Sequence, residues 1–389
     1  MNKKMSGFNT VSILSVSLLI YVSGSLIAPA LSSLAASFPE TPFPTIRMIM
    51  TSMYITIAAF ALISGKLAKT ISKKTLVLVG LAIYGICGLV GAKLNSVPAL
   101  MIDRLVMGVG VGLVFPQANA LIIDFYEGKT RDKLLGYGSG VSNLGSMLGS
   151  IVGGSLAAIS WRWNFVGFAS AFVIFLLVLF GVPSAPARKI GGEPVAASPR
   201  SLPKQFWLLP LYVCLVQMAA LVTPTNMAVF YLGNQIGSPA LLGITMALLT
   251  GLGFLAGFVL THTLKIFKNW TVVASCLMIG AGFFVISKAN NVAMVMIGQI
   301  LIGFGQGTLT PMVFIKNTQL VPVELRQRSL AILSSAIYLG CFGTSYVQKW
   351  IGQLFHNTDQ RFMFMAFAVG GFIATAAALA AKLASSKKA

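Results

Sequence analysis

The chain has 389 residues, of which 56% are hydrophobic and 9% charged, and its formal net charge is +20. Soluble domains average about 25% charged residues, so this composition excludes an ordinary water-soluble protein. It also gives no support to nucleic-acid binding, because the basic residues are spread over many short segments instead of being gathered on one face.

Uncharged runs of about 18 residues or more predict helices that cross a membrane. Residues 183–204, rich in Pro, Ala, Gly and charge, separate two groups of such runs and predict a linker. A turn signal at residues 233–239 divides the long uncharged stretch after it. The predicted spans are 11–34, 48–65, 75–92, 98–123, one within 134–161, 163–182, 206–232, 240–264, 270–287, 289–315, 329–348 and 362–381.

The distribution of Lys and Arg predicts the side of the membrane on which each loop lies. Twelve spans place both termini on one side, and 21 of the 28 Lys and Arg residues fall on that side. Cytoplasmic loops carry such an excess, so we expect cytoplasmic termini in the inner membrane of a bacterium. Arg47 is one of seven basic residues that remain on the outer side.

An internal repeat relates the two groups of spans. A shift of 195 residues places Gly108, Gly110, Gly112 and Pro116 on Gly303, Gly305, Gly307 and Pro311, and Arg104 on Gln299. The repeat predicts an all-α integral membrane fold of two pseudo-symmetric six-helix bundles, residues 1–182 and 205–389. Such two-halved architectures place a binding site at mid-membrane between the halves, and rocking exposes it to each side in turn.

The stretch from Arg104 to Gly154 carries the most specific motifs. It is predicted to form two helices joined by a short loop with Lys129, Arg131 and Lys133. The first helix contains Arg-x-x-x-Gly-x-Gly-x-Gly, beginning at Arg104. The second carries glycines at spacings that let another helix come close, namely Gly136, Gly145, Gly149, Gly153 and Gly154.

With these motifs the chain resembles the major facilitator superfamily, and within it the twelve-span drug:proton antiporters, over essentially its whole length. The glycines from Gly136 to Gly154 match the antiporter motif at every position but its proline, where Ser150 stands. This likeness implies exchange or export instead of import. It also implies a link between Arg104 and proton coupling.

The family's loop between spans 2 and 3 is matched in part by residues 65–74. Gly65, Leu67, Ala68 and the basic pair Lys73-Lys74 agree, whereas Lys69 replaces the family's acid. In the family that acid helps to latch the two halves in the outward-facing form. We expect Lys69 to pair instead with Asp124 at the inner end of span 4.

Arg104 has two open interpretations. It is either a coupling residue, since a charged group inside an apolar helix is costly, or an interfacial arginine whose head reaches outward water. Asp103 and Asp124 lie 21 residues apart, roughly 31 Å along a helix, and bracket the bilayer. Because no acid lies near the middle of a span, coupling uses Arg104 with a terminal acid, or the protein is not proton-coupled.

Neutral polar and aromatic side chains are the candidates for a substrate cavity, with helix-to-helix hydrogen bonds as the alternative role for each. By analogy with the family, spans 1, 4, 7 and 10 face the cavity. The candidates are Tyr21, Tyr54, Gln117, Asn119, Asn143, Gln217, Asn226, Gln299, Gln306 and Tyr338.

These features predict a secondary transporter that exports lipophilic small molecules, and not an enzyme. Its expected partners are a small-molecule substrate, protons and the lipid bilayer, and it is expected to be a monomer. No cofactor or metal is expected, since the four cysteines show no ligand spacing and the glycine runs form no phosphate-binding loop. Two alternatives remain: a uniporter or exchanger of a neutral or anionic metabolite, siderophore or lipid, and a membrane receptor without turnover.

Overall fold

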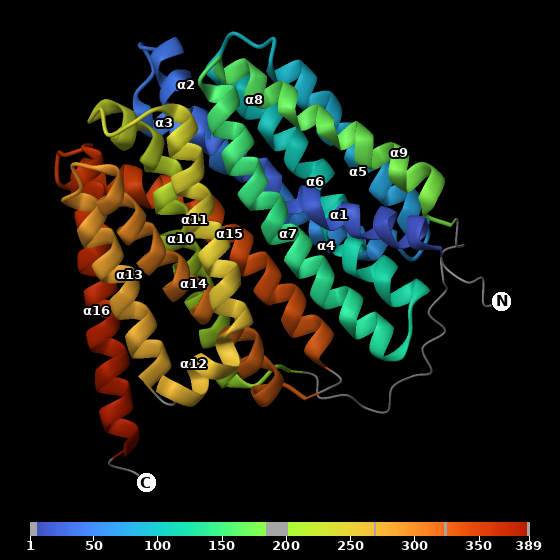
Figure 1. Ribbon diagram of the computed structural model, residues 1–389. Helices are drawn as coiled ribbons and strands as arrows, with labels where there is room; N and C mark the ends of the chain where they lie inside the picture. The colour runs from blue at the N-terminus through green and yellow to red at the C-terminus, as the bar shows by residue number, and fades with distance from the viewer. Residues whose placement is uncertain (1–5, 184–200, 268–269, 323–324, 387–389) are drawn as a thin grey trace.

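The computed structural model describes residues 6–183, 201–267, 270–322 and 325–386, and these residues are almost entirely helical. Figure 1 shows two groups of helices, the first in blue to green and the second in yellow to red. The helices of the first group are α1 (Gly7–Ser25), η1 (Ala28–Ala30), α2 (Leu31–Ser37), α3 (Phe43–Thr51), α4 (Met53–Leu67), α5 (Lys73–Gly91), α6 (Val97–Phe125), α7 (Gly128–Ala157), α8 (Trp161–Gly167), η2 (Phe168–Ser170) and α9 (Ala171–Gly181).

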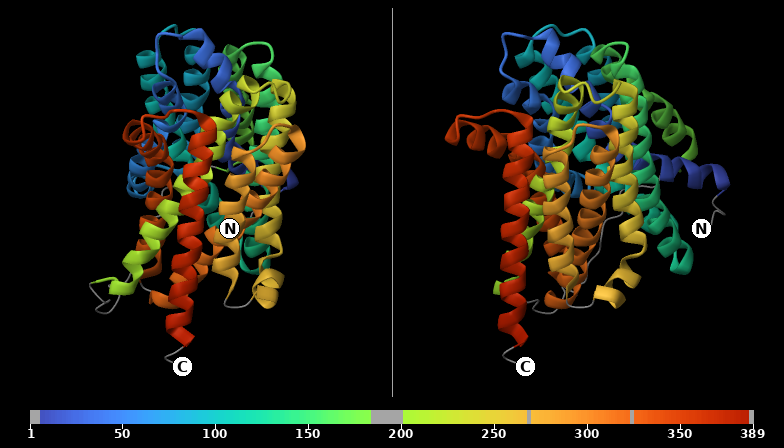
Figure 2. Two further views of the ribbon diagram at one scale, coloured as in Figure 1. Left: turned by 90° about the vertical axis from the view of Figure 1, so that its left-hand side faces the viewer. Right: turned by 60° about the vertical axis from the view of Figure 1, so that its left-hand side comes forward.

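The second group contains the remaining helices, and α16 runs along its outside (Figure 2). Most of the predicted linker, residues 183–204, lies outside the described residues. The helices are η3 (Lys204–Trp207), α10 (Leu208–Gly233), α11 (Pro239–Phe258), α12 (Leu260–Phe267), α13 (Thr271–Ser287), α14 (Val292–Leu320), α15 (Arg326–Leu354) and α16 (Gln360–Ser386).

The twelve predicted spans correspond to helices of different apolarity. Among the described residues, nine helices are long and apolar enough to cross a membrane, and the bent pair Gly7–Leu18 and Val22–Ser37 makes a tenth. The other two are α13, which has only 17 residues, and α7, which is rich in Ser and Gly and begins with basic residues. A bundle tolerates a helix as polar as α7 because the polar side of that helix packs against protein instead of lipid.

The predicted boundary of the fifth span requires a correction. Lys129, Arg131 and Lys133 do not form a loop, because α7 begins at Gly128 and includes all three. Nothing in this segment breaks a helix, and charged residues are tolerated at an end that reaches water. By contrast, the turn predicted at residues 233–239 is confirmed, since α10 ends at Gly233 and α11 begins at Pro239.

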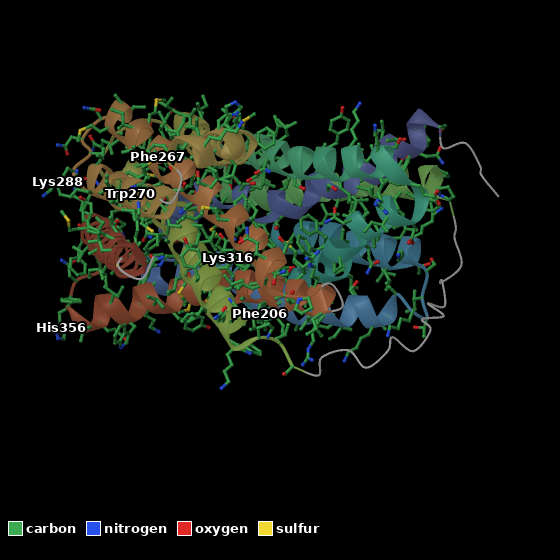
Figure 3. All side chains as sticks on the ribbon, turned by 90° about the horizontal axis from the view of Figure 1, so that it is seen from below. Phe206, Phe267, Trp270, Lys288, Lys316 and His356 are labelled. Carbon is green, nitrogen blue, oxygen red and sulfur yellow. The ribbon has the colours of Figure 1, made fainter. Side chains whose placement is uncertain are left out.

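The chain reverses direction after each span, which gives the bundle two faces. We call the face at the C-terminal ends of α4, α6, α9 and α14 the linker face, because the predicted linker follows α9. The other face is called the opposite face. Lys288 follows the end of α13 and His356 follows the end of α15, so both lie at the opposite face. In Figure 3, a view from below, both are seen at one edge of the second bundle. The groups meet where α7 packs on α11 and α4 on α15.

Candidate functional site

A cavity of about 1150 Å³ lies between the two groups of helices. The first group lines it mainly from α1, α4 and α7, and the second from α10, α11, α14 and α15. It reaches Lys133 and Tyr137, which are exposed near the linker-face end of α7. The cavity therefore faces the linker face.

Five of the predicted cavity residues line this cavity: Tyr54, Asn143, Gln217, Gln306 and Tyr338. The rings of Tyr54 and Tyr338 stack with centroids 6.3 Å apart, across the boundary between the groups. Phe115 meets Tyr338 edge to face at 5.3 Å. These rings form an aromatic wall of the kind that packs against flat apolar ligands.

Three of the predicted cavity residues lie in α6 and α14 but do not line the cavity. Gln117 is buried and donates to the hydroxyl oxygen of Ser64 at 2.8 Å, so its role is to join α6 to α4. Asn119 is exposed, and Gln299 is fully buried in α14. Gln117 therefore matches its alternative predicted role, a helix-to-helix hydrogen bond, and the rotation of each helix decides whether a polar residue in it faces the cavity.

Two predicted cavity residues remain. Asn226 does not line the cavity, because it belongs to a buried network described below. The side chain of Tyr21 lies outside the described part of the chain, so its predicted role stays a prediction.

The lining is nearly neutral. Among the described residues that border the cavity, Lys133 is the one charged side chain, and none is acidic or a histidine. No group of three or more His, Cys, Asp or Glu residues in the described chain is placed to hold a metal ion. The cavity offers amides, hydroxyls and aromatic rings.

A buried polar network closes the opposite face. Arg47 of α3 is 2% exposed and donates hydrogen bonds to the side-chain oxygens of Asn226, at 2.6 Å, and of Gln348. Asn226 in turn donates to Gln348 at 2.6 Å. The network joins the first group to α10 and α15 of the second, so it must break before the cavity can open to this face.

Two further contacts lie on the same side of the cavity as this network. Thr51 donates to the hydroxyl of Ser345 at 2.8 Å. Gly154 of α7 meets Gly243 of α11 so closely that an added Cβ on Gly154 would lie 2.8 Å from the Cα of Gly243. Both contacts join the first group to the second and so add to the closure.

The distribution of charges along the sequence predicts Arg47 to be an outer, water-exposed residue and gives no sign of this closure. Arg47 lies only four residues after the start of α3 at Phe43, a position that usually reaches water. Nothing in the sequence around it indicates that a second bundle covers it.

The glycines of α7 divide by what they contact. An added Cβ on Gly145 or Gly153 would lie closer than 3.0 Å to the carbonyl oxygen of Leu18 or Leu26, respectively. Both glycines are therefore places where α7 touches the first span.

The other glycines of the motif have different surroundings. An added Cβ on Gly149 would meet the Ser25 hydroxyl at 2.5 Å, whereas Gly136 has nothing within 4 Å and borders the cavity. The part of the motif from Gly145 to Gly153 joins α7 to the first span, and Gly154 joins it to the second group.

Arg104 is fully buried within the first group and does not line the cavity. Its guanidinium carbon lies 4.9 Å from the ring centroid of Phe165 and 4.6 Å from that of Phe168, and it donates to the sulfur of Met107 at 2.9 Å. The interpretation of an arginine reaching outward water is therefore wrong. Aromatic faces stabilise the buried cation.

Asp103 is also buried, at 7% exposure, instead of marking the water boundary. Its Oδ2 atom has no hydrogen-bond partner and lies 2.9 Å from where a Cβ on Gly91 would stand. The same added Cβ would meet the ring of Phe165, which also contacts Arg104. The two charged residues thus share one buried pocket at the opposite-face end of α6.

The expected pairing of Lys69 with Asp124 is wrong. The partner of Asp124 is Lys73, with Nζ and Oδ2 2.6 Å apart, and Lys69 is exposed. Lys73 is the first residue of α5, after the turn that holds Lys69, so the chain presents it to the end of α6. The salt bridge connects two helices of the same group and is no latch between the groups.

The fold and cavity together define a multi-pass membrane transporter, with a site between two helical bundles that is closed at one face. The sequence profile of the Major Facilitator Superfamily matches residues 13–342 and 226–388. The chain belongs to this family, whose members transport small molecules. Family membership also confirms the prediction that the protein is not an enzyme.

Comparison with known proteins adds relatives of several kinds. The chain is 28% identical to the uncharacterized MFS-type transporter YceJ of Bacillus subtilis over 78% of each chain. It is 32% identical to the quinolone resistance protein NorA of Staphylococcus aureus over 130 residues, 32% of this chain and 33% of that protein. A similar match to the uncharacterized transporter EfpA of Mycobacterium tuberculosis, 32% identical over 119 residues, covers 30% of this chain and 22% of that one.

The chain thus spans a third or less of the length of two of these relatives. Among solved structures, the nucleoside transporter NupG superposes with a TM-score of 0.74 at 14% identity, over 96% of this chain and 98% of that one. At such identity the likeness concerns the fold. It confirms the predicted fold class of two six-helix bundles.

Proposed function

We propose that this protein exports lipophilic small molecules from the cytoplasm by alternating access. The observation that carries the proposal is the cavity between the bundles, lined by apolar and aromatic side chains and closed at one face by Arg47, Asn226 and Gln348. Such a lining suits ligands that bind mainly by burial of apolar surface.

Three further observations support export. NorA, a similar protein, is named for quinolone resistance, and the relative tcpA of Claviceps purpurea is named as a thioclapurine efflux transporter. The glycine pattern of α7 resembles the antiporter motif. The excess of Lys and Arg on the linker side favours a cytoplasmic linker face. In the described conformation the cavity would then receive its ligand from the cytoplasm, and transport would carry the ligand out across the inner membrane of a bacterium.

Proton antiport is the proposed driving reaction, with the buried pair Asp103 and Arg104 as the coupling site. Asp103 supports this assignment because it combines burial with an unpartnered carboxylate oxygen, and such groups in a membrane are costly unless they serve a task. Asp124 is a weaker candidate, because it is paired with Lys73 and partly exposed. The division into residues 1–182, 183–204 and 205–389 is part of the same proposal.

The test is flux in proteoliposomes that contain the purified protein and a panel of lipophilic compounds. Antiport predicts substrate movement in step with a change of luminal pH. An Asp103→Asn variant should lose the dependence on a pH gradient but still bind ligand, while Asp124→Asn should retain it. Flux by the native protein that ignores a pH gradient would contradict antiport, and absence of flux for the whole panel would contradict transport.

A second candidate function is uniport or exchange of a neutral or anionic metabolite. The absence of acidic and histidine side chains among the described residues of the cavity lining favours it, because proton-coupled carriers generally place a titratable group on the substrate pathway. Flux down a substrate gradient, unchanged by pH in the native protein and in Asp103→Asn, would select this candidate.

A further inference from the structure

The polar groups of the cavity carry no negative charge in the part of the chain that the structure describes. The polar side chains of the lining include the amides of Asn143, Gln217 and Gln306, and the charged group among the described lining residues is the ammonium of the exposed Lys133. Lys133 lies beside Tyr137, with its nitrogen 5.4 Å from the ring centroid. The cavity therefore has a cationic entrance and a neutral interior.

Gln306 supplies an uncommitted donor. Its amide nitrogen is buried and has no hydrogen-bond partner, although the residue borders the cavity from α14. A buried donor left unsatisfied is costly, so a ligand with an acceptor group near it would relieve this cost. Glutamine also has an acceptor oxygen, so the difference between an anion and a cation depends on Lys133 and on the absence of acidic side chains from the described lining.

We propose that the cavity selects lipophilic aromatic anions and rejects lipophilic cations. This inference rests on the export function proposed above, since it names the charge class of the substrate. An aromatic body would pack on the wall of Tyr54, Phe115 and Tyr338, and its negative charge would face amide donors and Lys133. A cation in the same place would lose hydration without gaining a carboxylate partner, which is expensive for a buried charge.

The net charge of the chain strengthens this selection. Its value of +20 raises the potential around the entrance and attracts anions from solution. This long-range term is screened by salt, with a Debye length of about 8 Å at physiological ionic strength. Selection between ions inside the cavity should persist in added salt, whereas the attraction of anions by the positive surface charge should decrease.

Two ions of equal shape and opposite charge, neither of which carries a hydrogen-bond acceptor, test the selection by charge alone: tetraphenylborate and tetraphenylphosphonium. Equilibrium binding of each to the full chain in neutral detergent should show the borate binding at least tenfold more tightly. Gln306→Glu should reverse the preference by placing a carboxylate in the cavity. Lys133→Glu should weaken borate binding several-fold, while Lys129→Glu, an exposed neighbour that does not border the cavity, should change it little.

Gly136→Trp controls for binding to the detergent or the protein surface. Gly136 borders the cavity with open space around it, so a large side chain there should fill the entrance and abolish specific binding of the borate. If Gln306→Glu fails to fold, the exposed Lys133→Glu still tests the selection by charge.

Equal or tighter binding of the phosphonium by the native chain would overturn the inference, and so would failure of both ions to bind. Neither result would overturn export, because the proteoliposome assay measures flux of a panel of lipophilic compounds separately. Conversely, selective borate binding without flux of any compound would sustain the selection by charge and contradict the proposed export.

Discussion

The guanidinium of Arg47 in α3 lies 2.6 Å from the side-chain oxygen of Asn226 in α10, across the boundary between the two bundles. The contact is buried, and Gln348 of α15 completes it from the second bundle. Among the hydrogen bonds of the described residues, this cation is held by neutral oxygens and by no carboxylate. Such a cluster can separate without leaving a buried carboxylate behind, which suits a gate that must open and close.

Replacing Arg47 by methionine should weaken closure of the opposite face. Hydrogen bonds to charged groups contribute about 1.5–3 kcal/mol each, and about 1.4 kcal/mol shifts an equilibrium tenfold. We therefore expect thiol labelling of a Thr51→Cys probe, in a chain whose native cysteines are replaced by serine, to become at least tenfold faster.

Arg162→Met is the matched control for the gate. Arg162 also lies near the opposite face, but it donates to the carbonyl of Ala92 and the side chain of Asn95, both within the first bundle. Its loss should leave labelling of the Thr51→Cys probe unchanged. Equal acceleration by both variants would mean that Arg47 stabilises the fold in general and is not part of a gate.

Two glycines of one motif should respond differently to replacement by alanine. At Gly145 the new Cβ would collide with the backbone oxygen of Leu18, which cannot move aside cheaply, and overpacking of this kind costs about 1–3 kcal/mol. At Gly136 nothing lies within 4 Å, and alanine favours a helix by about 1 kcal/mol over glycine. Thermal unfolding in detergent should show a lower Tm for Gly145→Ala and an unchanged or higher Tm for Gly136→Ala.

The sequence predicted the bundle because apolar length and the Lys and Arg distribution depend on residue type alone. It predicted that the glycines from Gly145 to Gly154 pack closely, since spacing fixes which of them share a face. It did not predict which bundle each would touch. That choice depends on the crossing of α7 with α1 and α11, which a pattern within one helix does not encode.

The polar candidates for the cavity also show that a pattern within one helix does not reveal which neighbour a residue contacts. Tyr54 and Gln306 border the cavity, whereas Gln117 and Asn226 hold helices together. All four are uncharged residues in apolar spans, and only the rotation of each helix separates the two roles. Arg47 was missed for a related reason: its position near the start of a span suggested water, while packing of the second bundle over it removed that water.

The salt bridge between Lys73 and Asp124 should contribute little to stability. Its two side chains are each about a quarter exposed, and exposed ion pairs typically contribute about 0.2–1 kcal/mol. A double-mutant cycle with Lys73→Ala and Asp124→Ala, followed by thermal unfolding, should give a coupling energy in this range. The parallel cycle with Lys69→Ala should give none, and a larger coupling for Lys69 would restore the pairing that the structure contradicts.

Replacing Arg104 by methionine should separate transport from ligand binding. Arg104 is buried against Phe165 and Phe168 and does not border the cavity, so a side chain of similar length keeps the packing and leaves the site intact. If Arg104 and Asp103 form the coupling site, the variant should bind ligand with native affinity yet lose at least tenfold of its flux driven by a pH gradient.

Gln299→Met is the matched control for this coupling test. Gln299 stands at the equivalent position of the second bundle and is equally buried, so its variant should retain flux driven by a pH gradient. Unchanged pH-driven flux in Arg104→Met would remove Arg104 from the coupling mechanism, because the cation would then be dispensable for the proton step. Loss of both binding and flux in that variant would assign Arg104 a structural role, since a residue outside the cavity can weaken binding only through the fold.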